Sequence, residues 1–244
     1  MHPLGHSRTT LCRTHALIAP DSHVPAALAG WERTRGVVHI SPAMGAGFVQ
    51  YTATLEVGSA TTGAPAGVER FVYVVEGEVD IDGARVGAGA YAYFPADHSH
   101  RIAGAGRASI LVFEKMFEPA NGAKPRTVSG HESKIERVAF QGDADARLQV
   151  LLPDEPAYDM AVNIFTYAPG AMLPQVECHV MEHGLLMLDG MGVYRLNESW
   201  HPVQAGDVIW MSAFCPQWFI AGGKSPSRYI YYKNVNRAPN LVRT

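Results

Sequence analysis

Residues 170–190 read GAMLPQVECHVMEHGLLMLDG. Glu177, His179 and His183 in this segment are all odd-numbered, so a β-strand would turn their three side chains to the same face. One carboxylate and two imidazoles on one face form a donor set that suits a divalent first-row metal ion. Residues 206–217 read GDVIWMSAFCPQ, and Gln217 would bring a fourth donor from a partner strand. The two segments together predict a metal site.

Two other interpretations compete with this metal site. Residues 179–183 also match H-x-x-E-H, the inverted zinc-protease signature, which needs a helix to bring its two histidines together. Gly184, Gly190 and Gly192 disfavour a helix, because a glycine costs about 1 kcal/mol in a helix interior. The other alternative is that the polar residues are structural and that no metal binds. The shared parity of the three donor residues favours the metal site.

The pattern of strands and turns occurs twice along the chain. Residues 71–83 predict a hairpin that turns at Glu76-Gly77. Gly58 and Gly170 are 112 residues apart, and Gly77 and Gly190 are 113 apart. The strand-forming segments that correspond are Phe48–Leu55 with Met160–Tyr167, and Phe71–Val75 with Gly184–Leu188. One internal repeat of this length indicates a duplicated domain.

Residues 170–190 and 206–217 resemble the two motifs of the cupin family. The first motif, G-x5-H-x-H-x3,4-E-x6-G, is matched by Glu177, His179, His183 and Gly190, with Gly170 one residue further upstream than the motif asks. The second, G-x5-P-x-G-x2-H, is matched from Gly206 to Gln217 with other residues at its fixed positions. The exchanged donors, followed by YIYYK at residues 229–233 and by Asn236-Arg237, resemble the ureidoglycine aminohydrolase family of bicupins. The resemblance covers about Val37 to Arg237.

The resemblance implies an all-β bicupin, with two tandem β-barrels of the jelly-roll type. We expect an irregular lead-in over residues 1–35 and an N-terminal cupin barrel without metal ligands over 36–117. A linker over 118–135 and a C-terminal barrel with the metal site over 136–244 complete the expected chain. The implied activity is a manganese-dependent hydrolysis of (S)-ureidoglycine to (S)-ureidoglycolate and ammonia, in the breakdown of allantoin and purines. Iron(II) is the alternative metal.

The residues beyond the metal ligands suggest how a substrate is held. Tyr229 and Lys233 lie at positions i and i+4 of a predicted strand, and Tyr194 lies on the strand after the first motif. If these side chains face the barrel interior, a nearby cation would lower the pKa of Lys233 and let it act as a proton shuttle. The two tyrosines would bind the substrate by hydrogen bonds. The alternative is that their side chains only pack within the sheet. We therefore predict catalytic roles for Lys233 and Tyr229, and substrate binding by all three residues.

The first repeat lacks most of the predicted ligands. Subtracting the offset of 113 places Ala64, Ala66 and Arg70 at the positions of Glu177, His179 and His183. His100 takes the place of Gln217, and we expect it and His98 to be surface or turn residues. The N-terminal barrel is therefore expected to be structural.

Composition excludes several classes of partner. Apolar residues make up 47% of the 244 residues, the net charge is −3, and the three cysteines are too few for a disulfide scaffold. Nucleic-acid and membrane partners are not expected. We expect a cytoplasmic homo-oligomer that acts on a small molecule. Two other functions stay open, a non-haem metal dioxygenase and a metal-free module that binds a small molecule.

Overall fold

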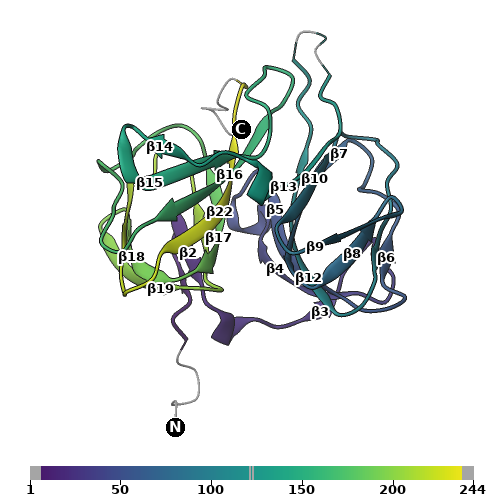
Figure 1. The fold of residues 1–244 in the computed structure, drawn as a ribbon, viewed down its shortest axis with the longest axis horizontal. Helices are drawn as coiled ribbons and strands as arrows, with labels where there is room; N and C mark the ends of the chain where they lie inside the picture. Colours follow the sequence, from purple (N-terminus) through teal and green to yellow (C-terminus); the bar gives the residue numbers. More distant parts are fainter. Residues whose placement is uncertain (1–6, 121, 123, 238–244) are drawn as a thin grey trace. The chain divides into compact units, whose positions relative to one another are not determined.

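The computed structural model describes residues 7–120, 122 and 124–237 (Figure 1). Their regular elements are β-strands, apart from three single-turn 3₁₀ helices, η1 (Pro20–Ser22), η2 (Pro42–Met44) and η3 (Glu132–Lys134). No helix in this part of the chain could span a membrane. The chain forms two compact units. Among the described residues, those of 24–135 and 154–159 form the N-terminal unit, and those of 7–23, 136–153 and 160–237 form the C-terminal unit.

The N-terminal unit consists of two antiparallel sheets. In hydrogen-bonded order, its seven-stranded sheet contains β13 (Val128–His131), β10 (Ala90–Phe94), β7 (Val68–Glu76), β12 (Ala108–Met116), β5 (Val49–Leu55), β4 (Arg35–Ile40) and β3 (Ala26–Ala27). Its four-stranded sheet contains β6 (Ala60–Thr61), β11 (Ile102–Gly104), β8 (Glu78–Ile81) and β9 (Ala84–Gly87). Val72 and Val112 of the larger sheet share one apolar core with Val79 and Ile102 of the smaller one. Burial of this core holds the two sheets together.

The C-terminal unit repeats this arrangement. In hydrogen-bonded order, its eight-stranded sheet contains β1 (Thr10–Leu11), β2 (His15–Ile18), β20 (Val208–Met211), β17 (His183–Asp189), β22 (Ser227–Asn234), β16 (Met160–Tyr167), β15 (Asp143–Val150) and β14 (Val138–Phe140). Its three-stranded sheet contains β19 (Ser199–Gln204), β18 (Met191–Leu196) and β21 (Gln217–Ala221). Leu185 and Tyr229 of the larger sheet pack with Leu196 and Phe219 of the smaller one. The all-β class and the duplication expected from the sequence are confirmed.

The expected hairpin at Gly77 is wrong, because β7 and β8 belong to different sheets. The chain changes sheets at Gly77, where φ is +78° and an added Cβ would lie 2.3 Å from the carbonyl oxygen of Arg107. Only glycine fits this corner without strain. The hairpin forms one step later, where Asp82 and Gly83 both have positive φ and join β8 to β9.

The expected irregular lead-in differs from the structure. Within residues 1–35 the structure has β1, β2 and β3, and β2 pairs with β20 so that Leu17 lies opposite Ile209. Strand β2 has only four residues, all of them buried, which is too short to show a period, and its partner lies far along the sequence. Residues 1–6 of this segment lie outside the described residues.

The boundaries expected for the linker and for the second barrel also differ from those in the structure. Within residues 118–135, β13 pairs with β10 and belongs to the sheet of the N-terminal unit. Gly130 allows this pairing, because an added Cβ would lie 2.7 Å from the Tyr91 hydroxyl oxygen. Residues 154–159, expected in the C-terminal barrel, also belong to the N-terminal unit. Residues 121, 123 and 238–244 lie outside the described residues.

Candidate metal centre

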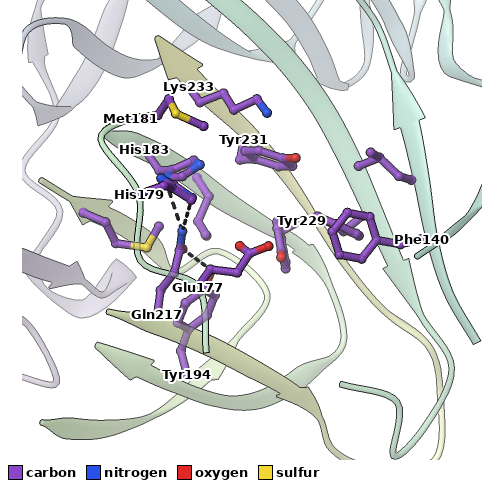
Figure 2. A pocket seen from close by; sticks show the side chains of 14 residues that line it. Phe140, Glu177, His179, Met181, His183, Tyr194, Gln217, Tyr229, Tyr231 and Lys233 are labelled. Carbon is purple, nitrogen blue, oxygen red and sulfur yellow. Dashed lines mark hydrogen bonds between the residues drawn. The ribbon is translucent and has the colours of Figure 1, made fainter. Parts of the chain in front are cut away.

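A pocket of about 200 Å³ lies within the C-terminal unit (Figure 2). Its polar lining consists of Glu177, His179, His183, Tyr194, Gln217, Tyr229, Tyr231 and Lys233. Its apolar lining consists of Phe140, Leu148, Phe165, Met181, Leu185 and Met211. The pocket therefore brings together every site residue predicted from the sequence, and it adds Tyr231.

The predicted donors do not share one strand. His183 is the first residue of β17, whereas Glu177 and His179 precede this strand in an irregular segment. Two backbone hydrogen bonds of 2.8 and 2.9 Å join Glu177 to Gln217 as an isolated bridge, and the Phe214 amide donates to the His179 carbonyl oxygen at 2.7 Å. The prediction of one continuous strand is wrong. Isolated backbone hydrogen bonds, and not a continuous ladder of them, hold this segment. The absence of a helix at His179 and His183 also excludes the zinc-protease interpretation.

Two imidazoles converge on one point of the pocket. The Gln217 Nε2 lies 3.2 Å from His179 Nε2 and 3.4 Å from His183 Nδ1. The Gln217 Oε1 accepts a hydrogen bond from the Tyr194 hydroxyl at 3.2 Å. In Figure 2 the Glu177 carboxylate points away from the two imidazoles. The amide nitrogen of Gln217 thus faces the lone pairs to which a cation would bind.

The residues fit a divalent cation after two side-chain rotations. Throughout the described part of the chain, no three His, Cys, Asp or Glu side chains lie close enough to hold a metal as they stand. A cation needs the amide oxygen of Gln217, so the amide must turn over, and the Glu177 carboxylate must turn toward the imidazoles. The Tyr194 hydroxyl can both donate and accept, so it can remain bonded to either end of the amide. The backbone bridge between Glu177 and Gln217 keeps both side chains within the pocket.

Burial sets the charge of these groups. Desolvation lowers the pKa of His179 and lowers that of His183 further, with the Lys233 charge acting in the same direction. Both imidazoles are therefore neutral at pH 7, which is the form that binds a metal. Burial raises the pKa of Glu177, and the positive charge of Lys233 opposes that rise.

The aromatic wall of the pocket holds three tyrosines. Tyr194 and Tyr229 are both buried, and the Tyr229 hydroxyl forms a 3.0 Å hydrogen bond with the Tyr167 hydroxyl. Tyr231, which was not predicted from the sequence, accepts a 3.1 Å hydrogen bond from Asn163 Nδ2. Its parity with Tyr229 and Lys233 was the signal that could have identified it.

The N-terminal unit carries an arginine at the corresponding position. Arg70 lies opposite Glu114 in the β7–β12 pair, as His183 lies opposite Lys233 in the β17–β22 pair. Its Nε donates to Glu114 Oε1 at 2.6 Å, and one guanidinium nitrogen lies 3.1 Å from His100 Nε2. His98 is exposed as expected, but the expectation for His100 is wrong, because it is buried against Phe94 with ring centroids 3.8 Å apart. In the N-terminal unit a buried guanidinium thus lies at the strand position that the His183 imidazole has in the C-terminal unit.

Because several histidines are buried, we predict that the metal-free protein loses stability in acid. Burial lowers the pKa of His15 and His201, and it lowers that of His100 to about 4. Because the unfolded chain takes up protons near pH 6.5, the stability that these histidines contribute should be complete above that pH and be lost as the pH drops toward 4. Thermal unfolding of chelated protein between pH 8 and 4.5 measures this. A His15→Gln/His201→Gln variant should show a flatter profile, and a wild-type midpoint independent of pH would contradict the prediction.

Comparison with known proteins identifies the family. No family model matches the chain. An Arabidopsis thaliana protein named (S)-ureidoglycine aminohydrolase is 39% identical over 240 residues, which cover 96% of this chain and 80% of that protein. This chain belongs to the (S)-ureidoglycine aminohydrolase family. The resemblance inferred from the exchanged cupin donors is therefore confirmed.

Solved structures share this fold. The crystal structure of Escherichia coli protein Ylba matches with a TM-score of 0.85 and 32% identity, over 98% of this chain and 97% of that one. A variant of Bacillus subtilis oxalate decarboxylase matches with a TM-score of 0.69 and 13% identity, over 90% of this chain and 77% of that one. At that identity the second match concerns the fold alone. The cupin fold expected from the sequence is confirmed.

Proposed function

We propose that this protein hydrolyses (S)-ureidoglycine to (S)-ureidoglycolate and ammonia, with a divalent metal ion in the pocket of the C-terminal unit. The observation that carries the proposal is the meeting of four donor side chains with three tyrosines and a lysine in one pocket, in a chain of this family. The proposed metal ligands are Glu177, His179, His183 and Gln217.

Manganese(II) is the proposed metal. Mixed oxygen and nitrogen donors without a thiolate suit Mn(II) or Fe(II) better than structural zinc. Glu177 supplies one negative charge and the other donors none, so a dication keeps about one positive charge to attract an anionic substrate. When bound, the metal supplies a Lewis acid that polarises the substrate or a water.

The side chains of the pocket account for the movement of protons. In the reaction, a C–O bond forms with water and the C–N bond to the α-amine breaks. One proton of the water leaves with the amine as ammonia, so the overall change needs no oxidant. Lys233 lines the pocket and is half-buried, which suits a group that passes this proton to the amine. Tyr194 and Tyr229 present hydroxyls that orient the polar arms of the substrate.

The reaction should proceed equally fast with and without oxygen. The expected result is ammonia release at the same rate in air and under argon, because hydrolysis transfers no electrons. Mn(II) should restore activity after chelation, and the product should be (S)-ureidoglycolate. Product chirality separates the enzyme from spontaneous breakdown of the substrate, which need not be stereoselective. Oxygen uptake equal to product formation would favour the dioxygenase alternative, and racemic product at the background rate would exclude catalysis.

A further inference from the structure

The three tyrosines of the pocket differ in what their hydroxyl protons do. The Tyr194 hydroxyl donates to Gln217, and the Tyr229 hydroxyl is paired with that of Tyr167. The Tyr231 hydroxyl instead accepts, from Asn163 Nδ2 at 3.1 Å. Because a hydroxyl carries one proton and Asn163 supplies the proton of this bond, the Tyr231 proton is left for another acceptor. No acceptor for it is present among the described residues.

Contacts with neighbouring rings hold the ring of Tyr231 in the wall of the pocket. It stacks on Phe165 at a centroid distance of 5.7 Å and contacts the His183 ring at 5.6 Å. Only 8% of Tyr231 is exposed, and it lines the pocket together with Lys233, two residues further along the same face of β22. Burial raises the pKa of Tyr231, so the hydroxyl remains a donor at neutral pH.

Among the described residues, the side chain of Asn163 makes no hydrogen bond other than the one to Tyr231. It lies directly opposite Tyr231 in the β16–β22 pair and is 3% exposed. Its Oδ1 has no hydrogen-bond partner among the described residues. Burying an amide costs free energy unless its hydrogen bonds within the protein replace those it made to water. The bond to Tyr231 is the one that Asn163 makes with a side chain of the pocket.

We propose that Tyr231 binds the substrate carboxylate by donating its free proton, and that Asn163 is a positioning residue that holds the hydroxyl in this orientation. A carboxylate is favoured over the ureido arm because Lys233 is the one Lys or Arg among the lining residues. A hydroxyl and an ammonium on one strand face suit an anion, and hydrogen bonds to charged groups are the stronger ones. The identity of the substrate rests on the proposed function.

Tyr231→Phe tests the first part, since it keeps the ring and removes only the hydroxyl. KM should rise by about 10- to 100-fold, as expected for the loss of a hydrogen bond to a charged group, while kcat changes little. Tyr232→Phe is the matched control, because its side chain lies on the opposite face of β22, and its KM should equal that of the wild type. An unchanged KM in Tyr231→Phe would overturn the assignment.

Calorimetry with two stable probes identifies the arm that Tyr231 binds and does not depend on turnover. N-carbamoylglycine carries a carboxylate and a ureido arm, and N-carbamoylglycinamide replaces the carboxylate by an amide. The wild type should prefer the acid, and Tyr231→Phe should lose about 10-fold or more of that preference. Equal weakening of both probes would assign Tyr231 to the ureido arm and overturn the proposal. A protein that binds the acid in this way but releases no ammonia would contradict the proposed function alone.

A double-mutant cycle tests the positioning role of Asn163. Asn163→Leu should raise KM in the same direction as Tyr231→Phe, and the double variant should be no worse than Tyr231→Phe, because both changes remove one interaction. Asn163→Ala replaces the leucine variant if that protein does not fold. Losses that multiply in the double variant would show that Asn163 acts independently and would overturn its assignment.

Discussion

His179→Ala and His183→Ala should each lose the bound metal and reduce ammonia release to the uncatalysed rate. The two imidazoles are the only donors of the pocket that already converge on a common point, 3.2 and 3.4 Å from the Gln217 nitrogen. Removing either leaves one imidazole, one carboxylate and a weakly donating amide, a set that should bind a divalent ion much less tightly. Elemental analysis of the purified variants after reconstitution with Mn(II), together with an ammonia assay, measures both effects.

His100→Ala is the control for metal loss, because His100 lies in the N-terminal unit beside Arg70. It should keep a full complement of metal, although its melting temperature should fall since a buried side chain is removed. Full metal occupancy in the His179→Ala protein would show that the ligand assignment is wrong.

Lys233→Met should lower kcat by about 100-fold or more while the protein keeps its metal and its fold. Methionine retains an unbranched chain of similar length and removes the ammonium group that would carry the proton to the departing amine. Lys233 lies opposite His183 in the β17–β22 pair, so the change is close to the proposed metal but removes no ligand. Steady-state kinetics with metal analysis on the same preparation separates turnover from metal loss.

Lys224→Met is the matched control, because Lys224 is exposed in the same unit and does not line the pocket. Its kcat should equal that of the wild type. If Lys233→Met also stays within a factor of a few of the wild type, Lys233 is structural and the proposed path of the proton fails.

Local spacing in the chain predicted the duplication and most of the polar residues of the pocket, and the resemblance to the cupin family supplied the class of fold. The odd positions 177, 179 and 183, and again 229 and 233, carry side chains that all line one cavity. Alternation along a strand is a local property, so it can be recognised without knowing any partner strand. Only His183 of the first three residues lies in a strand, and the backbone bridge to Gln217 keeps Glu177 within the pocket.

Contacts between distant segments decided the remaining features. The partner of β2 is β20, nearly the whole chain away. The four residues of β2 are too few to show a sequence pattern that predicts this pairing. The burial of His100 depends on Arg70 and Phe94, and the orientation of the Tyr231 hydroxyl depends on Asn163, 68 residues earlier. A hydrogen bond of this kind is specified by which side chains the fold brings within 3 Å or so, and spacing along the chain does not contain that information.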